Sequence, residues 1–229
     1  MKAGDVLSYL DMCRHEGVNL QRGMNFRLRG KESVILMSVR AGAPYSDRVE
    51  DNGNVLIYEG HDIPARDRRV NPKAVDQQAN NPSGSLTQNG RFFKAALDFK
   101  TKGTLPERVR VYEKIRDGIW VYNGNFNLVD AWTEDSNARK VFKFKLCLVE
   151  DVSITAVAHP ELEHERVIPS EVKRAVWIRD KGRCVTCDSG DNLHFDHIIP
   201  YSKGGSSLVV ENIQIMCARH NLAKSNNIE

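Results

Sequence analysis

Two pairs of potential metal ligands lie near the C-terminal end of the sequence. Cys184 and Cys187 form the first pair, and Cys217 and His220 repeat the same spacing further along the chain. Three thiolates and an imidazole are soft ligands that suit tetrahedral Zn²⁺. Because four ligands leave no open position for a substrate, we predict a structural zinc site. Such sites contribute on the order of 10 kcal/mol in model peptides, which a segment with a small apolar core needs.

An acid and a histidine stand side by side between the two ligand pairs, in the stretch LHFDHIIPYSKGG. On a regular strand Asp196 and His197 would point to opposite faces, so they can share a substrate only where the strand ends. Pro200 and the glycines after it supply such an end. A neutral imidazole with a pKa of about 6.5 can accept a proton at neutral pH, and a carboxylate can bind a hard cation. A histidine in an apolar strand can equally be a hydrogen-bonded core residue, so both interpretations stay open on these residues alone.

The order of these motifs resembles the HNH nucleases. A C-x2-C pair, FDHIIPYSKGG, ENIQIMC and a second ligand pair follow one another, and the resemblance covers 169–226. It implies a ββα-metal fold in which two strands and a helix surround one divalent cation. It also implies that His197 is the general base, that Asp196 and Asn221 hold Mg²⁺ or Mn²⁺, and that Asn212 orients the imidazole through its side-chain carbonyl.

The sequence departs from the HNH pattern at two positions. Asn221 stands where the family often has a histidine, and His220 stands where a fourth cysteine is more common. His220 could therefore bind the catalytic cation instead, which would leave the zinc with three cysteines. The sequence leaves this alternative open.

The region before the HNH-like segment is expected to be rich in β-structure, with one or two helices. Its patterns predict strands within 33–60, an irregular loop over 62–90, a short helix over 91–103 and further strands over 107–149. Inside the last of these segments, an Asp-Gly pair at 117–118 and an Asn-Gly pair at 123–124 predict two turns.

Three stretches of this region together resemble the SRA domain, also called YDG, which binds DNA and flips a modified cytosine into a pocket. They are SVILMSVRAGAPYSDRVEDNGNVLIYEGHD, LTQNGRFFKAA and VRVYEKIRDGIWVYNGNFNLVDAW, and the resemblance covers about 20–150. Tyr122-Asn123-Gly124 replaces the family's Tyr-Asp-Gly. The resemblance implies that aromatic rings stack on the flipped base and that an acid accepts the cytosine amino proton.

Four residues are predicted to form the modified-base pocket: Tyr45, Asp47, Tyr58 and Glu59. The two tyrosines match the family's aromatics, although packing within a sheet would explain them equally well. Asp47 is the nearest acid, but the segment is one residue longer than in related sequences, so Glu50 and Asp51 stay as alternatives. Glu59 stands where a small hydroxyl residue often lies.

Composition limits the remaining possibilities. The net charge is only +3, so charge does not by itself indicate a nucleic-acid partner. No apolar run approaches the roughly 18 residues that cross a bilayer, and the acids among the first 16 residues argue against a signal peptide. We therefore expect no membrane partner and a cytoplasmic location, where the five cysteines are not expected to form disulfides.

These patterns together predict an α+β chain of two domains. A twisted SRA-like β-barrel or sheet with flanking helices is expected over 1–155, a linker over 156–168, and a zinc-stapled HNH domain over 169–229. The predicted function is a homodimeric, modification-dependent endonuclease that flips 5-methylcytosine or 5-hydroxymethylcytosine in double-stranded DNA, hydrolyses nearby phosphodiester bonds and restricts modified foreign DNA. The alternatives are a non-catalytic reader with a degenerate nuclease domain and an HNH nuclease that does not depend on modification.

Overall fold

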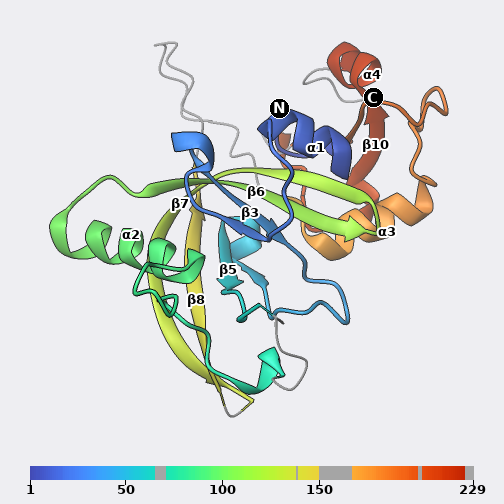
Figure 1. Ribbon diagram of the computed structural model, residues 1–229. Coiled ribbons are helices and arrows are strands. Elements are labelled where there is room, and N and C mark those ends of the chain that lie inside the picture. Colours follow the sequence, from blue (N-terminus) through green and yellow to red (C-terminus); the bar gives the residue numbers. More distant parts are fainter. Residues whose placement is uncertain (65–70, 138, 150–166, 201–202, 225–229) are drawn as a thin grey trace.

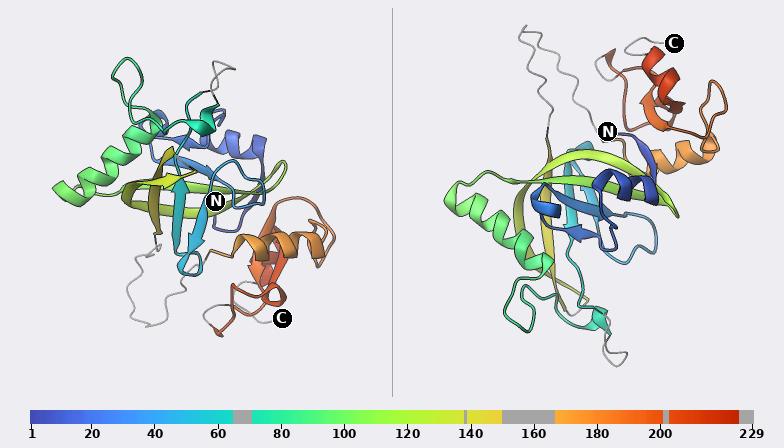
Figure 2. Two further views of the ribbon diagram at one scale, coloured as in Figure 1. Left: turned by 90° about the horizontal axis from the view of Figure 1, so that it is seen from below. Right: turned by 45° about the horizontal axis from the view of Figure 1, so that its top comes forward.

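The computed structural model describes most of the chain, namely residues 1–64, 71–137, 139–149, 167–200 and 203–224. A large twisted sheet with helices beside it forms one part, and a hairpin with two helices forms the other (Figure 1; Figure 2). The α+β class predicted from the sequence is confirmed. Of the predicted linker, only residues 167 and 168 lie within the described residues.

The large sheet has eight described strands in the order β2-β3-β6-β7-β8-β5-β4, with β1 paired to β7. The strands are β1 (Val6–Ser8), β2 (Met24–Asn25), β3 (Ser33–Met37), β4 (Arg48–Glu50), β5 (Val55–Glu59), β6 (Glu107–Arg116), β7 (Ile119–Ser136) and β8 (Arg139–Leu148). The pairing is antiparallel except between β3 and β6, which run parallel.

Two α-helices and three 3-10 turns accompany the sheet: α1 (Tyr9–Glu16), α2 (Gln88–Lys102), η1 (Leu28–Gly30), η2 (Asp51–Gly53) and η3 (Pro72–Ala74). The α2 helix begins three residues before the predicted start, because the Thr87 hydroxyl accepts a hydrogen bond from the Gly90 amide and caps it. It ends at Gly103, as predicted, in the left-handed conformation that glycine tolerates best.

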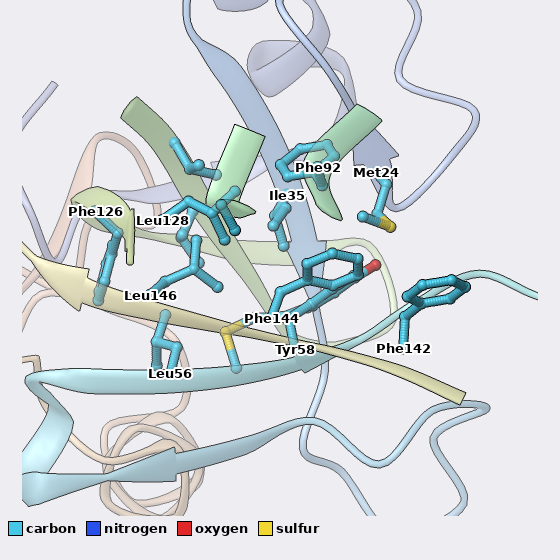
Figure 3. Packing of buried hydrophobic residues seen from close by; sticks show 14 of the residues in the cluster. Met24, Ile35, Leu56, Tyr58, Phe92, Phe126, Leu128, Phe142, Phe144 and Leu146 are labelled. Atoms are coloured by element: carbon cyan, nitrogen blue, oxygen red, sulfur yellow. The ribbon is translucent and has the colours of Figure 1, made fainter. Parts of the chain in front are cut away.

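The core of the sheet lies between its inner face and α2. Phe92 of α2 packs against Phe144 of β8, with ring centroids 5.9 Å apart, beside Leu56, Tyr58 and other buried side chains (Figure 3). Burial of apolar surface contributes about 25 cal/mol per Å², so this cluster is the main source of stability for the sheet.

One of the two predicted turns is wrong. The Asp-Gly turn joins β6 to β7 as expected, but Asn123-Gly124 lies inside β7. Val111 pairs with Gly124 across the ladder. The next residue, Tyr112, pairs with Tyr122, so Asn123 is an extra residue and forms a bulge. Gly124 has a φ of 103°, which favours glycine and accommodates the bulge without ending the strand.

The C-terminal part contains α3 (Ser170–Arg179), β9 (Leu193–His197), η5 (Val210–Asn212), β10 (Ile213–Cys217) and α4 (Ala218–Lys224). The β9 and β10 strands pair antiparallel, and α4 follows β10 directly, which gives the predicted strand-strand-helix order. The apolar face of α3 packs against this hairpin in a second buried cluster.

Candidate nuclease site and base-binding cavity

The two predicted ligand pairs come together at one end of the β9–β10 hairpin. The ligand atoms of Cys184, Cys187, Cys217 and His220 all lie within 4.8 Å of one another. The His220 Nδ1 atom lies 3.5 Å from the Cys184 Sγ and 3.3 Å from the Cys217 Sγ. Three thiols and an imidazole at this spacing fit a tetrahedral Zn²⁺ site. The position of His220 within the cluster favours it as the fourth ligand rather than as a ligand of a separate catalytic cation.

The surroundings of Cys184 favour the thiolate, which is the metal-binding form of cysteine. Burial alone would raise the pKa of the Cys184 thiol. Backbone amides, the first of them that of Cys217, more than offset this effect and lower the pKa to about 6.

Asp196 and His197 are the last two residues of β9, as the sequence predicted for a strand that ends at this point. Their side chains have different partners. One carboxylate oxygen of Asp196 accepts from the Nζ of Lys224 at 2.6 Å and from the side-chain Nε2 of Gln214 at 3.3 Å. The Nε2 of His197 lies 2.7 Å from the Ser207 hydroxyl.

Asn212 holds the loop that follows β9. Its side-chain oxygen accepts from the Ile199 amide at 2.8 Å, and its side-chain nitrogen donates to the carbonyl oxygens of Ile199 and Ser206. A Cβ added at Gly205 would collide with the Ile199 carbonyl, so this position needs glycine. Through its bond to the Ser206 carbonyl oxygen, Asn212 lies next to Ser207, the hydrogen-bond partner of His197.

Lys224 is a residue of the nuclease site that sequence reasoning missed. It lies on α4, three residues after Asn221, and it is buried. Besides its contact with Asp196, its Nζ donates to the His197 carbonyl oxygen. An ammonium group and a divalent cation are attracted to the same carboxylate, so Lys224 lies where it competes for Asp196. Its place one helical turn after His220 was the available signal.

A cavity of about 510 Å³ opens beside the large sheet, between β3, β5 and the start of the chain. Its walls include the predicted residues Tyr45, Asp47 and Tyr58, together with His61 and Gly23. Tyr45 is half-buried, whereas Tyr58 is buried. The volume falls in the usual range for small-molecule sites, roughly 300 to 1,000 Å³.

Asp47 is the acid that the structure places in this cavity. Its two carboxylate oxygens accept from the backbone amides of Ser38 at 3.1 Å and Glu59 at 3.0 Å. Burial raises the pKa of Asp47 to about 7, and these two hydrogen bonds only partly oppose the increase. The other two candidate acids, Glu50 and Asp51, are exposed.

Glu59 does not line the cavity, although it was predicted with the pocket residues. It follows Tyr58 on β5, and adjacent side chains of a strand point to opposite faces. Its carboxylate instead lies 2.9 Å from the Nζ of Lys143 and 3.6 Å from a guanidinium nitrogen of Arg139. These buried contacts place Glu59 behind the cavity wall.

His61 is a cavity residue that sequence reasoning missed. Its ring stacks on Tyr45 with centroids 5.6 Å apart, and its Nε2 lies 3.1 Å from the Tyr58 hydroxyl. Burial lowers the pKa of His61 to about 4, so the imidazole is neutral at neutral pH. The Asn89 side chain binds both the amide and the carbonyl of His61 at 2.8 Å, which fixes this loop to the start of α2. The sequence offered one indication of this role, since His61 follows the predicted pocket residue Tyr58 by only three residues.

The strand-strand-helix arrangement of β9, β10 and α4 agrees with the family model that matches this segment. Residues 184–227 match the family model described as HNH endonuclease. The HNH prediction is therefore confirmed for this C-terminal segment. A search of curated proteins finds no match to the chain.

Solved structures resemble larger parts of the chain. The SRA domain of SUVH5, solved with hemi-methylated CG DNA, is 25% identical, with a TM-score of 0.45 over 70% of this chain and 94% of that one. The same SRA domain bound to fully hydroxymethylated CG DNA is 24% identical, with a TM-score of 0.45 and the same coverage. The modification-dependent restriction endonuclease TagI is 20% identical, with a TM-score of 0.42, over 99% of this chain and 78% of that one.

The structure also bears on the membrane prediction. Among the described helices, none combines the length and the apolar character needed to span a bilayer.

Proposed function

We propose that the chain is a DNA endonuclease that depends on a modified cytosine. The observation that carries this proposal is the pairing of an HNH segment with a cavity that is lined by Asp47 and two tyrosines. The cavity would take the flipped base from double-stranded DNA, and the hairpin would hydrolyse a phosphodiester bond nearby. Restriction of modified foreign DNA, in the cytoplasm, is the biological role that fits this pairing.

The cavity residues supply what a flipped cytosine needs. Extruding a base costs a few kcal/mol, and stacking on aromatic rings offsets about 1 to 3 kcal/mol per base. Tyr45 and Tyr58 offer the rings, and Asp47 offers oxygen acceptors for the cytosine amino group. Each oxygen of Asp47 already accepts one backbone hydrogen bond but can accept another. A 5-methyl group adds about 1 kcal/mol of apolar contact, so a methylated base would be preferred over an unmodified one by a modest factor.

The hairpin residues would carry out the hydrolysis. His197 is the proposed base that takes the proton from the attacking water. Because its Nε2 contacts the Ser207 hydroxyl, the other ring nitrogen, Nδ1, would accept that proton. Asp196 and Asn221 would hold Mg²⁺ or Mn²⁺, which when bound supplies positive charge for the leaving oxygen. Asn212 was predicted to orient the imidazole through its side-chain carbonyl, but that oxygen accepts from the Ile199 amide, so we propose that Asn212 acts on His197 indirectly, through the residues that it holds. The cysteine and histidine cluster would hold a structural Zn²⁺.

A single HNH site cuts one strand. A double-strand break would therefore need either a homodimer or two successive nicks. We propose the homodimer, because two copies can place their sites on both strands of one duplex in a single binding event.

The test compares digestion of one plasmid in methylated and unmethylated form with Mg²⁺, by the wild type and by Asp47→Asn. The wild type should cut the methylated form faster, and Asp47→Asn should lower its cutting to the rate of the unmethylated form. The exposed neighbour provides the matched control, since Asp51→Asn should keep the wild-type preference. Equal cutting of both plasmids by the wild type would rule out the dependence on modification.

A further inference from the structure

A buried lysine joins the two parts of the molecule. Lys173 lies on α3, and its Nζ lies 2.8 Å from a carboxylate oxygen of Glu113 on β6 and 2.6 Å from the side-chain oxygen of Asn123 on β7. The Asn123 amide nitrogen completes the triangle, because it donates to the same Glu113 oxygen at 3.1 Å. All three residues are at most 1% exposed.

The positive charge of Lys173 compensates the negative charge of Glu113. Burial by itself would raise the pKa of Glu113, but Lys173 beside it holds that pKa below its usual value, so the pair is ionised. Removing either Lys173 or Glu113 would leave the other charge buried and uncompensated, which is strongly unfavourable. The two contacts of Lys173 therefore tie α3 to β6 and β7, while the other Glu113 oxygen, Oε1, has no hydrogen-bond partner among the described residues.

Asn123 reaches Lys173 because of the bulge in β7. It is the extra residue of Tyr122-Asn123-Gly124, the sequence that replaces the family's Tyr-Asp-Gly. A regular strand would pair Asn123 across the ladder, whereas the bulge redirects its side chain. This motif therefore contributes to the contact between the two parts in this chain.

The N-terminal residues form a second tie. The Phe195 amide donates to the Gly4 carbonyl oxygen at 3.1 Å, and Asp5 binds the Nδ1 of His194 through a carboxylate oxygen at 2.7 Å. A Cβ added at Gly4 would lie 3.0 Å from the Phe195 carbonyl oxygen, so the two backbones are in close contact. These contacts end one residue before Asp196, the first residue of the nuclease pair.

Between the two ties the apolar core is continuous. Ile115 of β6 and Val121 of β7 belong to the same buried cluster as Val176 of α3 and Phe195 of β9. An apolar contact alone has no preferred register, because hydrophobic burial is not directional. The hydrogen bonds of Lys173 with Glu113 and Asn123 are directional, so they define how α3 is placed on the sheet.

We propose that Lys173, Glu113 and Asn123 are positioning residues that fix the nuclease hairpin against the base-binding cavity, so that the protein cuts at one narrow offset from the modified base. This inference rests on the proposed function. None of the three residues lines the cavity or contacts Asp196 or His197 in the described structure. Their effect is on where the reaction takes place rather than on its chemistry.

The test uses end-labelled duplexes that carry one 5-methylcytosine, with Mg²⁺ and enzyme in excess, for the wild type and Lys173→Met. The wild type should cut within one or two adjacent bonds. In the variant, cutting at that position should fall by about 10-fold or more, since a shift of about 1 Å can cost roughly 100-fold in rate, and cuts at neighbouring bonds should appear. Lys31→Met, the same change at an exposed lysine, should leave the pattern unchanged.

Calorimetry of the protein without DNA tests the coupling through Lys173 separately from the proposed endonuclease function. The zinc-loaded wild type should unfold in one transition and Lys173→Met in two, because the hairpin is then uncoupled from the sheet. Two transitions in the wild type, or an unchanged cutting position with one transition in the variant, would overturn the coupling. One transition in the wild type, two in the variant and no cleavage of any duplex would support the coupling and refute the proposed function. If Lys173→Met does not fold, Asn123→Ala, which leaves the charge pair intact, is measured in the same way with the same outcomes.

Discussion

The two sites of this protein are positioned by different forces. The proposed base-binding cavity lies beside an eight-stranded sheet with a large apolar core, and hydrogen bonds from Asn89 fix the loop that carries His61. The nuclease site lies on a two-stranded hairpin, which is too small to be stable by itself. That hairpin carries the cysteine and histidine cluster that could hold a metal ion, and it packs against the sheet. The cavity thus rests on the larger apolar core, whereas the hairpin combines a smaller apolar cluster with specific polar contacts to the sheet.

The largest expected difference between the two parts should follow removal of the proposed zinc ion. Cys184→Ser, or chelation, should unfold the hairpin, because a closed site of this kind contributes on the order of 10 kcal/mol. Hydrogen exchange should then show loss of protection in β9 and β10, while β6 to β8 stay protected. Cys147→Ser, at a cysteine outside the cluster, is the matched control and should leave the hairpin protected. Equal loss of protection in both parts would show that the sheet also depends on the metal.

The nuclease site can next be disabled without disturbing the cavity. His197→Ala should reduce cleavage by about 100- to 10,000-fold, the usual range for a general base. Binding to modified duplexes should stay within error of the wild type, measured by fluorescence anisotropy with Ca²⁺ in place of Mg²⁺. His15→Ala, at an exposed histidine of α1, should change neither quantity. Undiminished cleavage by the His197 variant would refute the assignment of the base.

The cavity can be tested through the pH dependence of stability. The folded protein raises the pKa of Asp47 from 3.8 to about 7, so the bound proton stabilises the folded state. This stabilisation is fully present below about pH 4 and is lost as the pH rises through about 7. Between about pH 5 and about pH 8 the wild type should lose about 3 kcal/mol of unfolding free energy relative to Asp47→Asn, measured by urea denaturation. A difference that does not change with pH would show that Asp47 is not buried in the way described.

The smallest expected effect concerns the half-buried aromatic wall. Tyr45→Ala should weaken binding to a modified duplex by about 1 kcal/mol, at the low end of the range for base stacking, because Tyr58 remains. Tyr45→Phe keeps the ring and should bind nearly as well as the wild type. If both variants bound equally weakly, the hydroxyl of Tyr45 rather than stacking would be responsible.

The sequence predicted the local structure of the C-terminal region well, for a physical reason. Its ligands come in short spacings along the chain, and β9, β10 and α4 are consecutive elements, so local order determines which residues meet. The C-x2-C and C-x2-H pairs and the strand end at His197 could therefore be read directly. Lys224 was missed because its place one helical turn after His220 does not by itself show that α4 packs against β9 and buries it.

The sheet was predictable in class but not in detail. Alternating apolar residues indicated strands, but the bulge at Asn123 could not be distinguished from a turn, since Asn-Gly suits both. Glu59 was misplaced because its partners, Lys143 and Arg139, come from a strand more than 70 residues away. Lys173 would be assigned to a solvated helix face by any local pattern, and only the packing of α3 on β6 and β7 shows that it is buried.

The most direct test of the account is a competition between two duplexes in one reaction. They have the same sequence and length, and they differ only by a 5-methyl group on one cytosine. With Mg²⁺ and zinc-loaded wild-type enzyme, the account predicts that the methylated duplex is cut several-fold faster, in line with about 1 kcal/mol for the added methyl contact. Equal rates for the two duplexes would contradict the claim that the cavity directs the nuclease.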